Sequence, residues 1–79
     1  MTIISQSRYD EIITTTSFGE LVEAIPAESW EEFDKGNHAA LVPAIREHVP
    51  AEVLKGIGLD SSDEAGITNL VYMIATQGF

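Results

Sequence analysis

The chain contains no cysteine among its 79 residues. Disulfide bonds, thiolate metal sites and a cysteine nucleophile are therefore excluded. The sequence also lacks a glycine-rich phosphate loop, a zinc-binding motif and the residue order of a serine-protease triad. We accordingly expect a protein that is not an enzyme, with no catalytic residue, no cofactor and no metal. The absence of cysteine fits a cytoplasmic location, which is the compartment we expect.

Long apolar segments are also missing. Residues 1–8 have neither the charged nor the apolar region of a secretory signal peptide. The longest uncharged stretch, residues 65–79, is interrupted by Thr68, Asn69 and Gln77 and is too short and too polar to span a bilayer. We therefore expect no contact with a membrane.

Positive charge is scarce. Four Lys and Arg residues stand against 13 Asp and Glu residues, which gives a net charge of −9 at pH 7. The four basic residues are Arg8, Lys35, Arg46 and Lys55. They are too few and too widely spread to form the basic stripe that neutralises nucleic-acid phosphates. Direct nucleic-acid binding is therefore excluded, whereas basic protein surfaces would be attracted.

The length predicts one small domain that comprises residues 1–79. Hydrophobic residues make up 44% of the chain, which is enough to form a core. A chain of this size buries only about 60–65% of its unfolded surface, so a deep multi-residue active site would compete with stability. Binding on an outer surface is the expected mode of action.

Apolar residues recur at helical spacing over most of the chain, which predicts an all-α fold, a small bundle of four or five short helices. The expected helices are residues 17–25, 27–35, 37–48 and 50–57, and a last helix that begins within residues 60–64. Pro43 is tolerated only in a first turn, so the third helix either begins near Leu41 or is kinked. Pro50 is expected at the first helical position.

The first fifteen or so residues carry conflicting signals. Ser7 followed by acidic residues is typical of a helix start. The β-branched residues from Ile12 to Thr16 favour extended backbone instead. We expect a short helix that passes into an extended link, and then a helix that starts with a capping box of Ser17 and Glu20.

The last helix has an unusually wide apolar arc. Ile67, Leu70, Val71 and Ile74 share one side, and Tyr72 and Met73 widen it. This width predicts either a central helix or the seam of a homodimer. A structural subunit that dimerises through Tyr72 and Met73 is therefore one alternative function.

The most informative local feature is a run of eight acidic residues with no basic residue among them, between Tyr9 and Asp34. Like charges three or four residues apart oppose a helix by roughly 0.2–0.5 kcal/mol per pair. A carboxylate surface that docks on a basic partner is the functional interpretation, and a merely solvated surface is the alternative. The expected partner-binding residues are Glu20, Glu23, Glu28, Glu31, Glu32 and Asp34.

These features predict a small acidic protein-binding or inhibitory module. Its partner would be a protein with a basic surface, such as a nucleic-acid-binding complex. In size and charge the chain is similar to small acidic proteins of phage origin, including anti-CRISPR proteins and other DNA mimics, although no motif identifies one of those families.

A second resemblance involves the segment Gly58 to Asp63, with Met73 and Phe79 downstream. It is similar to the motif of acyl and peptidyl carrier proteins, in which a serine follows an aspartate and opens a helix. By that resemblance Ser61 would carry a phosphopantetheine arm. The family usually has Leu or Met after the serine, where this chain has Ser62, and an Asp/Ser helix cap accounts for the same residues.

Two aromatic residues and two histidines have simpler interpretations. Trp30 and Phe33 could anchor a partner, but the small core favours packing inside the domain. His38 and His48 lack the spacing of a metal site, so we expect them on the surface or at helix ends.

Overall fold

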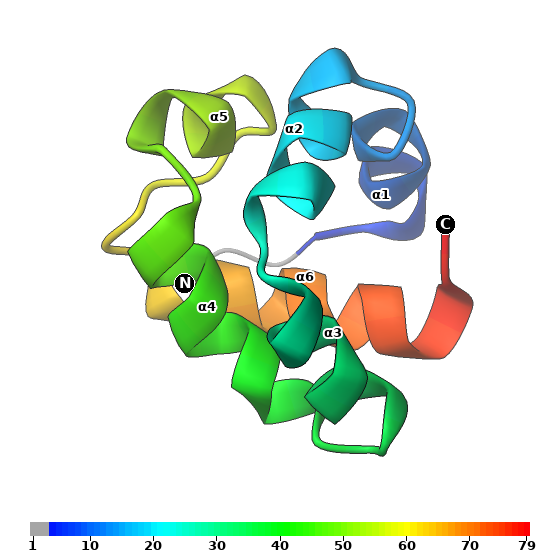
Figure 1. Ribbon diagram of the computed structural model, residues 1–79. Helices are drawn as coiled ribbons and strands as arrows, with labels where there is room; N and C mark the ends of the chain where they lie inside the picture. Colours follow the sequence, from blue (N-terminus) through cyan, green and yellow to red (C-terminus); the bar gives the residue numbers. More distant parts are fainter. Residues whose placement is uncertain (1–3) are drawn as a thin grey trace.

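The computed structural model describes residues 4–79, which form six α-helices, one 3₁₀ turn and no strand (Figure 1). The helices are α1 (Gln6–Ile12), α2 (Thr16–Ala24), α3 (Ala27–Asp34), α4 (Leu41–His48), α5 (Ala51–Gly56) and α6 (Glu64–Gln77), and the 3₁₀ turn η1 is His38–Ala40. The predicted all-α class is confirmed. The structure has six helices where a bundle of four or five was predicted, and α1 is the short helix that was expected in the amino-terminal segment.

The extended link expected after the first helix is replaced by a turn. The hydroxyl groups of Thr14 and Thr15 donate to the carbonyl oxygens of Glu11 and Ile12, each at 2.7 Å. These bonds satisfy two carbonyl groups at the end of α1. The threonine hydroxyls therefore form hydrogen bonds within the turn. The β-branched residues do not require pairing with a neighbouring strand.

The helix caps at this end differ from the predicted ones. The hydroxyl of Ser5, not Ser7, accepts from the backbone N–H of Arg8 at 3.2 Å. The hydroxyl of Thr15 accepts from the backbone N–H of Phe18 at 3.1 Å, so α2 begins before the predicted capping box. Ser17 instead lies against Gly56 of α5, where a side chain on the glycine would collide with its hydroxyl.

The proline positions follow from backbone geometry. Regular helix begins at Leu41, after η1, which places Pro43 in the first turn and confirms one of the two predicted arrangements. Pro50 occupies the N-cap of α5 with ψ of 145°, one residue before the predicted position. Gly36 ends the segment after α3 with φ of 101°, which glycine adopts without strain.

Helix α6 lies at the centre of the molecule. In Figure 1 it crosses the middle of the view, with α1, α2 and α5 on one side and α3 and α4 on the other. Its buried residues are Gly66, Ile67, Leu70, Val71, Met73 and Ile74. The sequence left a central helix and a dimer seam open, and the burial of Met73 within the chain's own core favours the central helix.

Long-range hydrogen bonds tie the amino-terminal segment that contains α1 to α6 and the residue that ends it. The backbone N–H of Ile4 donates to Asn69 at 2.7 Å, and the hydroxyl of Tyr9 donates to the carbonyl of Gly78 at 2.8 Å. Burial, aided by the charge of nearby Asp10, raises the pKa of Tyr9, so its hydroxyl stays protonated further into the alkaline range than that of a free tyrosine.

The core consists of hydrophobic residues, among which Tyr9 contributes the one hydroxyl group, and no charged residue is buried within residues 4–79. That part of the chain extends 27 × 24 × 23 Å. None of its helices is long and apolar enough to cross a membrane. The charged residues therefore lie outside the core, where their arrangement bears on function.

Candidate protein-interaction site

The six predicted partner-binding residues are all exposed, on α2 and α3. Helix α3 has no buried residue, and four of its eight residues are acidic. A helix this short and this charged is marginal in isolation. Contacts made by its two aromatic residues must therefore hold it in place.

Trp30 connects α3 to α2. Its indole N–H donates to the carbonyl of Val22 at 3.3 Å. This carbonyl lies in the last turn of α2, where the helix offers no N–H partner of its own. The bond both satisfies the end of α2 and fixes the position of α3 relative to it, so two acidic helices are held in one arrangement.

A chain of ring contacts extends this anchor. Trp30 meets Phe33 edge to face at 5.5 Å between ring centroids, and Phe33 lies 4.8 Å from the ring of His38. The ring of Phe79 also contacts the rings of Trp30 and Phe18, at 6.0 Å and 5.2 Å between ring centroids. Trp30 and Phe33 are partly buried against the core, which confirms their packing role in part and leaves some ring surface exposed.

An open depression of about 280 Å³ lies between α3 and the end of α4. We call it the acidic hollow, and its lining residues are Pro26, Glu28, Ser29, Glu32, Ala40 and His48. Glu28 and Glu32 are one helical turn apart and so project from the same side of α3. The imidazole of His48 provides a further polar group at the end of α4. Such a concave arrangement can accept a guanidinium or ammonium group.

Little of the negative charge of α2 and α3 is neutralised by ion pairs within the part of the chain that the structure describes. Glu32 pairs with Lys35 at 3.4 Å, and both side chains are largely exposed. An exposed pair of this type contributes about 0–1 kcal/mol. No ion pair involves the other five predicted residues within residues 4–79. Their charges remain available to an external partner.

The six predicted residues do not all meet in one place. Glu28 and Glu32 line the acidic hollow, whereas Glu31 and Asp34 are exposed elsewhere on α3. The other two, Glu20 and Glu23, lie three residues apart on α2, outside the hollow. The hollow is therefore the best-defined part of a broader acidic surface.

Ser61, the residue implied by the carrier-protein resemblance, lies in an exposed turn. Helix α6 begins three residues later, at Glu64, and the carboxylate of Asp63 caps it by accepting from Gly66 N–H at 2.9 Å. Asp60 accepts from the backbone N–H of Ser62 at 2.8 Å and from its hydroxyl at 2.7 Å. These bonds lower the pKa of Asp60. The segment thus forms a capping turn, and Ser61 does not open the helix.

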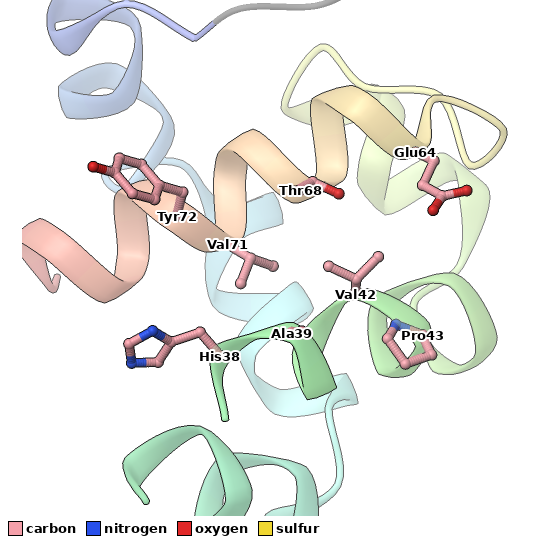
Figure 2. A pocket seen from close by; sticks show the side chains of 8 residues that line it. All are labelled: His38, Ala39, Val42, Pro43, Glu64, Thr68, Val71 and Tyr72. Atoms are coloured by element: carbon pink, nitrogen blue, oxygen red, sulfur yellow. The ribbon is translucent and has the colours of Figure 1, made fainter. Parts of the chain in front are cut away.

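Sequence reasoning missed a second and larger depression, shown in Figure 2. Its volume is about 450 Å³, and its lining residues are His38, Ala39, Val42, Pro43, Glu64, Thr68, Val71 and Tyr72. We call it the apolar groove. It lies between η1 and α4 on one side and α6 on the other, and its lining residues on the two sides are more than twenty residues apart in sequence. The one signal is the wide apolar arc of α6, which predicts either a central helix or a dimer seam.

Tyr72 is the exposed part of that arc. Its side chain is 64% exposed, whereas that of Met73 is 9% exposed and belongs to the core. The predicted dimer surface of Tyr72 and Met73 therefore does not exist as one patch. Tyr72 instead forms the edge of the apolar groove.

No group of three or more His, Asp or Glu side chains suited to holding a metal ion occurs within residues 4–79. No protein-family model matches the chain, and no curated protein or solved structure matches it either.

Proposed function

We propose that this chain is a small protein-binding or inhibitory module that acts by docking the carboxylates of α2 and α3 on a basic protein surface. The observation that carries this proposal is the set of exposed carboxylates on two helices held together by Trp30, of which only Glu32 has an ion-pair partner within residues 4–79. The module needs no reaction of its own, because occupying the partner's surface is sufficient to block it.

The composition of α3 supports a binding role. Its sequence places Glu28, Glu31 and Glu32 where like charges weaken the helix, and it ends on Asp34, where negative charge opposes the helix dipole. No residue of α3 is buried, so packing does not require these carboxylates. A partner with Lys and Arg side chains would relieve the repulsion and favour the complex.

A nucleic-acid-binding protein is the partner class that fits best. Side chains one helical turn apart are about 5–6 Å from each other at their Cβ atoms, so α3 presents closely spaced negative charges. A surface that binds a phosphate backbone carries the matching Lys and Arg groups. The proposed complex would therefore exclude nucleic acid from that surface.

The test is capture of proteins from host lysate, followed by affinity measurements on the captured protein in low and high salt. The triple variant Glu28→Lys, Glu31→Lys and Glu32→Lys should weaken binding by roughly tenfold or more, equivalent to about 1.4 kcal/mol. Raising the salt from about 0.01 M to about 1 M shortens the Debye length from about 30 Å to about 3 Å and should also weaken it.

A matched control carries the same change of charge elsewhere. Glu11→Lys, Glu47→Lys and Glu52→Lys alter three exposed residues outside α2 and α3. Circular dichroism should show helical content for both variants. Unchanged affinity of the α3 variant at low salt, or an equal loss in the control, would refute docking through α3.

A further inference from the structure

The apolar groove has a defined shape. Figure 2 shows Val42 of α4 and Val71 of α6 pointing toward each other, with His38 and Tyr72 at one end and Glu64 at the other. Val71 is buried and forms the floor, and Val42 is half-buried. The middle of the groove is therefore apolar, and polar groups lie at its two ends.

The groove is open along its length. Tyr72, on its edge, is 64% exposed, and Thr68 beside it is exposed as well. Sites for small molecules usually enclose about 70–90% of the ligand surface, which an open groove cannot do. The groove is bordered by helical segments on both sides, with apolar side chains between them. Such a groove suits an amphipathic helix that inserts its apolar side.

Charge decides which protein segment fits. No Lys or Arg lines the groove, and Glu64 stands at one end. The neighbouring Arg46 lies 3.2 Å from Glu64, but the two side chains are 45% and 68% exposed, and an ion pair in contact with solvent is weak. A second copy of the chain would bring together two bodies of charge −9, which repel each other. Charge complementarity therefore favours a basic segment.

The groove also adjoins the acidic surface. The ring of His38, at one end of the groove, contacts Phe33 of α3 at 4.8 Å. Ala39 lines the groove and its neighbour Ala40 lines the acidic hollow, so the segment that begins at η1 separates the two depressions. One partner could thus contact both.

We propose that the apolar groove binds an amphipathic helical segment of a basic protein. A large apolar side chain of that segment would lie between Val42 and Val71, and a Lys or Arg would approach Glu64. The inference rests on the proposed function for the positive charge of the partner, and it adds the structural element by which that partner is recognised.

Peptide probes test this directly. One peptide of about 18 residues, long enough to form a helix, would place Leu at helical spacing on one side and Lys elsewhere. A second would have the same composition in an order that destroys the apolar side, and a third would have Glu in place of Lys. Nuclear magnetic resonance of isotope-labelled protein would map where each peptide binds.

The amphipathic Lys peptide should shift amide signals of residues 38–42 and 64–72. The permuted peptide should affect mainly α2 and α3, because it retains charge without an apolar side. Equal shifts in the groove from the permuted peptide, or equal binding of the Glu peptide, would overturn the proposal. So would a dimer in sedimentation experiments that Tyr72→Ala converts to monomer, because a second copy would then occupy the groove.

A pair of variants on α6 provides the control. Thr68→Lys places a long cationic side chain in the groove, whereas Thr76→Lys makes the same change at an exposed position outside it. We expect roughly tenfold weaker binding of the amphipathic peptide by the first and little change by the second. Equal affinities of the two variants would refute the groove as the site.

The outcomes for the groove and for the acidic surface can be told apart. If only the groove inference fails, the Thr68 variant binds the captured partner normally while the triple α3 variant does not. If only docking through α3 fails, the triple variant binds the partner normally and the amphipathic peptide still shifts the groove signals.

Discussion

Helices α3 and α6 use their residues in opposite ways. Helix α6 buries six of its 14 residues and carries one acidic residue, Glu64, in its first turn. Helix α3 buries none of its eight residues and carries four acidic ones, including one at its last position. The single carboxylate of α6 suits the helix dipole, whereas the carboxylates in the last turn of α3 oppose it.

The comparison separates residues that the fold needs from residues that it tolerates. The sequence of α6 is largely explained by packing at the centre of the molecule. The sequence of α3 is explained by packing only at Trp30 and Phe33, which attach it to the rest. Packing therefore does not explain the acidic residues of α3, whereas the proposed partner would.

The largest expected effect is on stability and comes from a substitution in the core of α6. Leu70 is fully buried in α6, so Leu70→Ala should lower the free energy of unfolding by about 2–5 kcal/mol through lost burial and a cavity. Phe33→Ala should lower the free energy of unfolding by less than Leu70→Ala does. It removes a larger side chain, but Phe33 is only partly buried. Urea denaturation measures both, and a larger loss for Phe33 would show that α3 belongs to the core.

An intermediate effect is expected at the link between α2 and α3. Trp30→Phe retains an aromatic ring but removes the N–H that donates to Val22. The lost hydrogen bond should cost about 0.5–1.5 kcal/mol in the free energy of unfolding. Partner affinity should fall as well, since α3 would no longer be fixed relative to α2. Unchanged stability and affinity would mean that this bond does not position the acidic surface.

The smallest expected effects have opposite signs in the two helices. Asp34→Asn removes an unfavourable charge from the last turn of α3 and should raise stability by about 0.3–1 kcal/mol. Glu64→Gln removes a favourable charge from the first turn of α6, together with its ion pair to Arg46, and should lower stability by a similar amount. Thermal unfolding at low salt measures both. Changes of the same sign would contradict the electrostatic comparison.

Helix-forming segments could be predicted from the sequence because they depend on local spacing. The helical spacing of α2 and α6 and the break between the helices at 17–25 and 27–35 are predicted in this way. Cap positions were less predictable, since Ser5 and Thr15 compete with nearby Ser7 and Ser17 that are equally suited as caps. The close packing of Ser17 against Gly56, 39 residues away, is a tertiary contact that local patterns do not reveal.

The sequence by itself determined the helical class, the apolar core and the large excess of carboxylates, because each depends on residue type and short-range spacing. Only the tertiary structure decided that Glu28 and Glu32 share a hollow with His48, that Met73 is buried while Tyr72 is exposed, and that α4 and α6 enclose an apolar groove. These features arise between segments distant in the chain, and the packing of whole helices around α6 sets their relative positions.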